Sequence, residues 1–243
     1  MAEKTDTLPG GCKIIQDERH FRFGTDAILL ASFCRVKPNA LGVDLCSGQG
    51  VIALLLSSRT PLKHIDTLEI MPSLCDMAKR SVILNGFEDK MTVHCGDVRD
   101  IKGELELGKY DFVVCNPPYK QSGTGIPTAD KMRAAALHED MCSLNDVIAL
   151  GAKLLKFSGS MFLCQRPQRL ADIAVIGREH RMELKTVRFV HSYKDKSPSL
   201  VLCELRRGSA PETAVCPPFI LYEDKGVMTE EYKAVYGGEN YER

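Results

Sequence analysis

The sequence predicts an α/β protein with a doubly wound, mostly parallel β-sheet and helices on both faces. Two observations support this prediction. From about residue 41, short β-rich runs alternate with longer amphipathic stretches, a spacing typical of βαβ units. The last two predicted strands are joined only by "YKDKSP" (193–198), which is too short for a parallel crossover. We therefore expect the parallel sheet to end in an antiparallel hairpin.

The individual elements follow from local patterns. The first strand, "LGVDLC" (41–46), leads through a glycine turn into the helix "GVIALLLSSR" (50–59). After the strand "HIDTLEI" (64–70) comes a helix with Pro72 in its first turn and Gly86 at its end. Further strands are predicted at 91–95, 110–115, 160–165, 185–192 and 199–206, with helices near 143–156 and 167–181 and a polar loop at 120–133.

The length of 243 residues suits one large domain. We expect a single domain over residues 1–243. In this domain, residues 1–40 form a segment beside the cofactor and substrate, residues 41–207 form the cofactor-binding core, and residues 208–243 form a tail packed on that core. No internal repeat interrupts it.

Charge and cysteine content exclude several classes of protein. Lysine plus arginine equals aspartate plus glutamate at 32 each, so contact with a polyanion would need a local patch. The ten cysteines include no C-x-x-C pair, so we expect free thiols and no metal site. Without a signal peptide or eighteen successive apolar residues, the protein is expected to be cytoplasmic, outside membranes, and without an obligate protein partner.

Ligands of a doubly wound sheet bind outside the carboxyl ends of its strands. Four predicted strands are followed by polar or glycine-rich residues: Asp44 to Gly50, Glu69, Asp97, and Asn116 to Tyr119. Gly48 and Gly50 lie in a strand-to-helix turn, where the missing Cβ lets a ligand approach the backbone. The alternative is an ordinary tight turn in which Asp44 has a structural role.

Glu69 lies about twenty residues beyond the glycine turn, where doubly wound folds place an acid that accepts hydrogen bonds from ribose hydroxyls. The alternative is a solvated surface acid. "CSGQG" lacks the full G-x-G-x-x-G pattern, and a nicotinamide cofactor would leave the corner at 116–119 without a role. A nucleoside ligand without a pyrophosphate fits better.

The tetrapeptide "NPPY" (116–119) ends an apolar strand abruptly. Neither Pro117 nor Pro118 has a backbone N–H, so the Asn116 side-chain oxygen and the Pro117 carbonyl are two rigid acceptors. Such a pair can hold both hydrogens of a planar amine and aim its nitrogen at an electrophilic carbon. Tyr119 can stack on a splayed-out base. The alternative is a proline-rich turn with a partly buried tyrosine.

"VDLCSGQG", Glu69, "GDV" (96–98) and "NPPY" together resemble the class I S-adenosylmethionine-dependent methyltransferases of exocyclic amino or amide nitrogens. The resemblance implies a Rossmann-like seven-stranded sheet with an antiparallel last strand, and S-adenosylhomocysteine as product. It assigns the methionine and ribose end of the cofactor to Asp44, Gly48 and Gly50, the ribose hydroxyls to Glu69, and the adenine to Asp97 and Val98. The target amine is assigned to Asn116, Pro117 and Tyr119.

The segment "IIQDERHFRFGTDAILLASF" (14–33) and the stretches after residue 165 resemble the bacterial tRNA1(Val) adenine-37 N6-methyltransferase family. The resemblance places Thr25 and Asp26 beside the cofactor, adds Asn116 to the cofactor contacts, and places Pro118 and Lys120 at the substrate. It also implies tRNA as the partner. This chain departs from the family in two places: Cys46 stands where glycine is more common, and Leu137 replaces an arginine, for which Lys131 or Arg133 could substitute.

The charge distribution agrees with an RNA substrate. Residues 165–207 contain ten lysines or arginines against five acids, whereas residues 208–243 contain three against seven. A basic face would contact phosphates, and the alternative is ordinary scatter of charges. Three other functions stay open: N5-glutamine methylation of release factors, methylation of rRNA or DNA amino groups, and a scaffold without catalytic activity.

Overall fold

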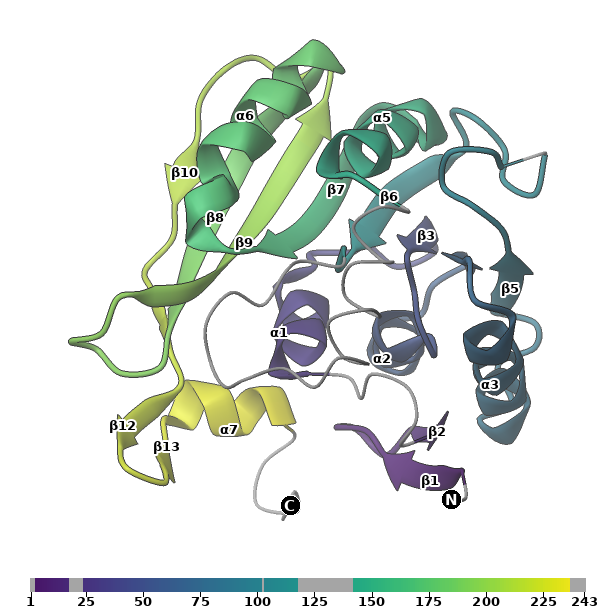
Figure 1. Ribbon diagram of the computed structural model, residues 1–243, viewed down its shortest axis with the longest axis horizontal. Coiled ribbons are helices and arrows are strands. Elements are labelled where there is room, and N and C mark those ends of the chain that lie inside the picture. The colour runs from purple at the N-terminus through teal and green to yellow at the C-terminus, as the bar shows by residue number, and fades with distance from the viewer. Residues whose placement is uncertain (1–2, 18–23, 102, 118–141, 237–243) are drawn as a thin grey trace, which may run out of the picture.

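The computed structural model describes residues 3–17, 24–101, 103–117 and 142–236, and a twisted β-sheet between two layers of helices forms its centre (Figure 1). The strands in spatial order are β5 (Met91–Cys95), β4 (His64–Glu69), β3 (Leu41–Leu45), β6 (Tyr110–Cys115), β7 (Leu155–Gln165), β9 (Pro198–Arg207) and β8 (Met182–His191). The first five are parallel, and β9 runs antiparallel to both β7 and β8. The predicted α/β class and the antiparallel terminal hairpin are confirmed.

The sheet is wider than the seven strands expected. Two short strands, β10 (Ala214–Val215) and β11 (Phe219–Ile220), pair in parallel with β8 and bring the total to nine. Each contains two residues, which is too short for the alternation of apolar and polar residues that predicts a strand. They cover the edge of β8 that would otherwise expose unpaired backbone groups.

The helices lie on both faces of the sheet, and each group packs in its own hydrophobic core (Figure 1). The first group is α1 (Thr25–Phe33), α2 (Val51–Arg59) and α3 (Pro72–Leu84), and the second is α5 (Leu144–Leu154) and α6 (Leu170–Glu179), which follows the 3-10 turn η1 (Pro167–Arg169). The helix expected to reach residue 156 ends at Leu154, and β7 begins at once, five residues earlier than predicted. Residues 156–158 of β7 are exposed, so they lack the apolar pattern that would have revealed this extension.

The middle of helix α1 is buried on all sides, because residues 27–31 are each at most 5% exposed. It packs on the sheet through Phe33, whose ring meets that of Phe162 edge to face. The N-terminal hairpin of β1 (Lys4–Thr7) and β2 (Lys13–Gln16) lies over the neighbouring helices α2 and α3, with the Cys12 thiol 3.8 Å from the Leu54 carbonyl and the Ile15 N–H donating to Ser81.

The C-terminal residues return to α1. After the hairpin of β12 (Tyr222–Asp224) and β13 (Val227–Met228), helix α7 (Glu230–Tyr236) buries Tyr232 and Tyr236 in the same core as α1 and α2. Both phenol hydroxyls lie close to the Thr25 Oγ1, at 3.4 and 3.5 Å. The tail therefore contacts the first residue of α1. No helix in the described ranges is long and apolar enough to cross a membrane.

Candidate active site

Parallel pairing brings the predicted strand ends to one edge of the sheet. Leu45 of β3 pairs with Leu68 of β4 on one side and with Cys115 of β6 on the other, and Glu69 of β4 pairs with Cys95 of β5. Asp44, Glu69, Asp97 and Asn116 consequently all lie at or just beyond the same edge. Their convergence follows from strand register and does not depend on flexible loops.

The turn between β3 and α2 takes a left-handed backbone conformation at three positions. The φ angles are +55° at Cys46, +57° at Gly48 and +82° at Gly50. Cys46 thus takes a backbone conformation that favours glycine, at some cost in strain. A Cβ on Gly48 would meet no atom of the described residues within 4 Å, so none of them fills the space beside the backbone there.

Glu69 joins this turn to the start of α3. Its carboxylate accepts hydrogen bonds from the N–H of Gly48 and from the N–H of Met71, both at 2.9 Å, and the residue is only 6% exposed. It is therefore not a solvated surface acid. Each oxygen keeps a second lone pair, so the carboxylate can still accept hydrogen bonds from a pair of ligand hydroxyls.

Asp44 is fully buried at the end of β3. One carboxyl oxygen accepts the N–H of Ala53 at 3.2 Å, whereas Oδ1 has no partner among the described residues. Burial raises the pKa of Asp44 to about 8, against the opposing effect of the Ala53 hydrogen bond and with a smaller contribution from Glu69. The buried Ser47 hydroxyl also lacks a partner in the described structure. Two such atoms in the same turn are suited to a polar ligand.

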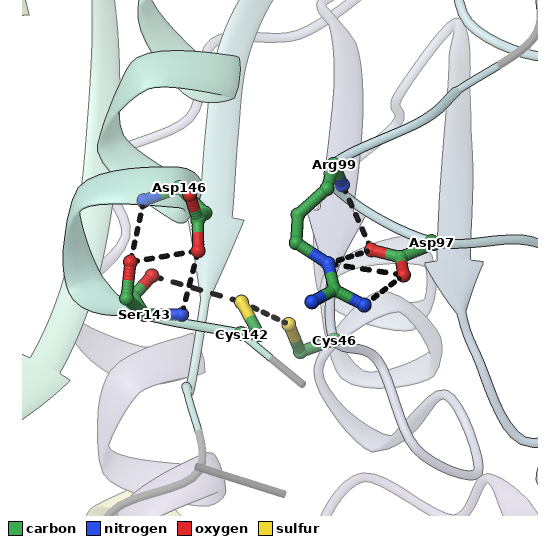
Figure 2. A network of polar contacts seen from close by, with 6 residues as sticks. All are labelled: Cys46, Asp97, Arg99, Cys142, Ser143 and Asp146. Atoms are coloured by element: carbon green, nitrogen blue, oxygen red, sulfur yellow. Dashed lines mark hydrogen bonds and ion pairs between the residues drawn. The ribbon is translucent and has the colours of Figure 1, made fainter. Parts of the chain in front are cut away.

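Asp97 pairs with Arg99, a residue that the sequence analysis did not identify. The guanidinium curls back onto the carboxylate, with a shortest N–O distance of 2.5 Å, and the Arg99 backbone N–H donates to the same group (Figure 2). These hydrogen bonds lower the pKa of Asp97. Val98 is partly buried against the core beneath α5. Nearby, the thiols of Cys46 and Cys142 point toward each other at 3.9 Å (Figure 2).

Asn116 lies at the end of β6 between two other elements. Its amide nitrogen donates to Asp26 Oδ2 of α1 at 3.3 Å, and its Oδ1 accepts the Cys164 thiol of β7 at 2.9 Å. Pro117 is buried beside it. Pro118, Tyr119 and Lys120 lie outside the described residues, as do the predicted loop at 120–133 and Leu137.

The basic residues of 165–207 are divided between the two ends of the strands, the end that holds Asn116 and the opposite end. Arg166 and the β8–β9 turn with Lys194 and Lys196 lie at the edge that holds Asn116, because Gln165 pairs with Val201 and His191 pairs with Pro198. Arg207 lies at the opposite edge, where it pairs with Met182. The expected single basic face is therefore wrong, and the turn with Lys194 and Lys196 lies at the same end of the strands as Asn116, with β7 and β9 between β8 and β6.

The geometry is suited to group transfer onto an amine. A glycine turn with unpaired buried polar atoms can hold one ligand, and a rigid amide with a neighbouring proline carbonyl can hold a second. In the described part of the chain, no group of three or more histidines, cysteines or acids is arranged to hold a metal ion. Sequence reasoning assigned no role to Cys164, Arg99, Tyr232 and Tyr236. The two tyrosines lie in the C-terminal stretch that resembles the family, and Cys164 and Arg99 lie in no recognisable motif.

Comparison with known proteins places this chain in a family. Residues 20–166 match the family model described as methyltransferase small domain. The chain is 29% identical over 222 residues to the tRNA1(Val) (adenine(37)-N6)-methyltransferase of Porphyromonas gingivalis, and the match covers 87% of this chain and 85% of that protein. A protein of the same name from Histophilus somni is 30% identical over 164 residues, or 67% of this chain and 68% of that protein.

Solved structures agree on the fold. A predicted O-methyltransferase from Agrobacterium tumefaciens superposes with a TM-score of 0.71 at 19% identity, covering 88% of this chain and 98% of that chain. TYW2 of M. jannaschii in complex with AdoMet gives a TM-score of 0.57 at 15% identity, covering 84% and 86%. The chain therefore belongs to the methyltransferase small domain family and, within it, to the family of the tRNA1(Val) (adenine(37)-N6)-methyltransferases.

Proposed function

We propose that this protein transfers a methyl group from S-adenosylmethionine to the exocyclic N6 of adenine in tRNA, at position 37 beside the anticodon. The observation that carries the proposal is the placement of Asn116 and Pro117 at the end of β6, on the strand that pairs with β3 and its glycine turn. The names of the curated relatives support the choice of substrate. With tRNA as substrate, we place the reaction in the cytoplasm.

The residues around the glycine turn fit the cofactor. The space beside Gly48, which no described atom fills, would admit its methionine and ribose end, and the Asp44 carboxyl and Ser47 hydroxyl would supply hydrogen-bonding groups there. Glu69 would accept the ribose hydroxyls, and Asp97 with Val98 would lie at the adenine. When bound, the cofactor supplies an electrophilic methyl carbon.

The chain's own groups then orient the amine. An adenine N6 conjugates its lone pair with the ring and is a poor nucleophile. Asn116 Oδ1 and the Pro117 carbonyl would accept its two hydrogens, which directs the lone pair toward the methyl carbon. Tyr119 would stack on the base. The nitrogen loses one proton to solvent once the new bond has formed.

Release-factor glutamine, rRNA and DNA are the competing acceptors, because two fixed acceptors read an amino or amide group and not a particular polymer. No relative reported above bears the name of a glutamine methyltransferase. Because the geometry alone does not distinguish these acceptors from tRNA, each of them is tested in parallel with tRNA.

The test is incubation of the purified protein with methyl-labelled S-adenosylmethionine and unmodified tRNA, rRNA, DNA or a release-factor domain in parallel. N6-methyladenosine at position 37, identified by mass spectrometry, is the expected product. Asn116→Ala should abolish turnover and leave cofactor binding intact, whereas Asn145→Ala, an asparagine of α5 bonded to His180, should change neither. Label on glutamine, or full activity of Asn116→Ala, would refute the proposal.

A further inference from the structure

Asn116 is held from both ends of its amide by side chains of two other elements. Asp26 belongs to the first turn of α1, and Cys164 belongs to β7. The register of β6 with β7, in which Cys115 pairs with Leu163, places Asn116 beside Cys164. We propose that Asp26 and Cys164 are positioning residues that fix which way the Asn116 amide points. This inference rests on the proposed function, in which Asn116 Oδ1 accepts the target amine.

Asp26 determines the direction of the amide because a carboxylate can only accept hydrogen bonds. The group of Asn116 that faces it at 3.3 Å must therefore be the NH2. In the flipped orientation two acceptor oxygens would face each other, which is repulsive. An uncharged amide at position 26 could present either an oxygen or an NH2, so it would not enforce one orientation.

Cys164 acts on the other end of the amide. Its thiol is fully buried and lies 2.9 Å from Asn116 Oδ1. Burial, and next the negative charge of Asp26, raise the pKa of Cys164, so the group stays an S–H donor. This bond uses one lone pair of Oδ1 and leaves the other for a hydrogen of the substrate amine.

Gly24, the residue before α1, leaves room for the Asp26 carboxylate. A Cβ on Gly24 would lie 2.3 Å from Asp26 Oδ1, so the carboxylate occupies the space that any other side chain would fill. Glycine at position 24 is thus a condition for the observed placement of Asp26. The resemblance had assigned Asp26 to the cofactor, whereas the geometry directs it at Asn116.

Three variants and two controls test the inference. Asp26→Asn should lower kcat on tRNA by about a hundredfold, the cost of a misplaced reacting group, while the Kd for S-adenosylmethionine stays within about twofold. Cys164→Ser, which keeps a donor, should retain most of kcat, and Cys164→Ala should lose about three- to tenfold. Asp172→Asn, in the first turn of α6, and Cys203→Ala, a buried thiol of β9, are the matched controls. Thermal melts identify any variant that fails to fold.

Two results would overturn the inference: a raised Kd for the cofactor with kcat preserved at saturation in Asp26→Asn, or equal kcat for Cys164→Ser and Cys164→Ala. A second readout does not depend on activity. The side-chain NH2 signals of Asn116 in a 1H–15N spectrum, assigned by their loss in Asn116→Ala, should shift in Asp26→Asn and stay in place in Asp172→Asn. If wild-type protein methylates another acceptor, the proposed function fails, and the kcat ratios are read on that acceptor instead.

Discussion

The buried carboxyl of Asp44 predicts an unusual dependence of stability on pH. An aspartate in an unfolded chain has a pKa near 4, whereas burial raises that of Asp44 to about 8. Between these values the folded protein holds one proton more than the unfolded chain at this site. The free energy of unfolding should therefore fall by about 1.4 kcal/mol for each pH unit as the pH rises through this window.

Replacing Asp44 by asparagine removes the titration and keeps an acceptor for the Ala53 N–H. From about pH 5.5 to about pH 7.5, wild type should lose about 2.5 kcal/mol relative to Asp44→Asn, since the slope diminishes as the folded-state pKa is approached. In a chain of this length, that corresponds to a relative fall in Tm of about 5–10 °C.

The assay is urea unfolding of both proteins, without added cofactor, at several pH values across this range. Asp76→Asn, at an exposed carboxylate of α3, serves as the control and should follow wild type at every pH. A constant difference in unfolding free energy between wild type and Asp44→Asn would refute the reasoning, because it would mean that Asp44 is already ionised in the folded protein at the lowest pH.

Two further predictions concern the ligands. Gly48→Ala and Gly86→Ala both place alanine in a left-handed conformation, with no described atom within 4 Å of the new Cβ, so each should cost about 1 kcal/mol of stability. Only Gly48→Ala should weaken cofactor binding by tenfold or more, measured by calorimetry. Lys194→Ala and Lys196→Ala should each raise the Kd for tRNA severalfold and reduce its salt dependence by about one contact, whereas Arg181→Ala at the opposite edge should change neither. These assignments would be contradicted if Gly86→Ala weakened cofactor binding as much as Gly48→Ala, or if Arg181→Ala raised the Kd for tRNA as much as the two lysine variants.

Much of the fold could be predicted because local signals were strong. Pro72 and Gly86 bracket α3 as expected, and Gly86 takes the left-handed φ of +64° that ends such a helix. The short connection at 193–198 required the β8–β9 hairpin. What could not be predicted was that β9 lies between β7 and β8, because that order depends on which strand edges remain available in the folded sheet.

Some features of the site could likewise be predicted from the sequence, and others could not. Glycine positions and the "NPPY" corner carry their own sequence signal, and their gathering at one edge follows from a parallel sheet. The contact between Cys164 and Asn116 joins residues 48 apart and depends on the register of β6 with β7. The burial of Asp44 depends on α2 closing over it. Neither is visible in a local pattern, since each is produced by packing between elements distant in the chain.

The contact of Tyr232 and Tyr236 with Thr25 has a consequence for synthesis of the protein. Thr25 begins the helix that carries Asp26, yet the two phenols that meet it lie 207 and 211 residues later. On the ribosome, the sheet from β3 to β7 can pair while α1 still lacks this cover. The first turn of α1, which also carries Asp26, therefore gains its two tyrosine contacts only after α7 has emerged from the exit tunnel.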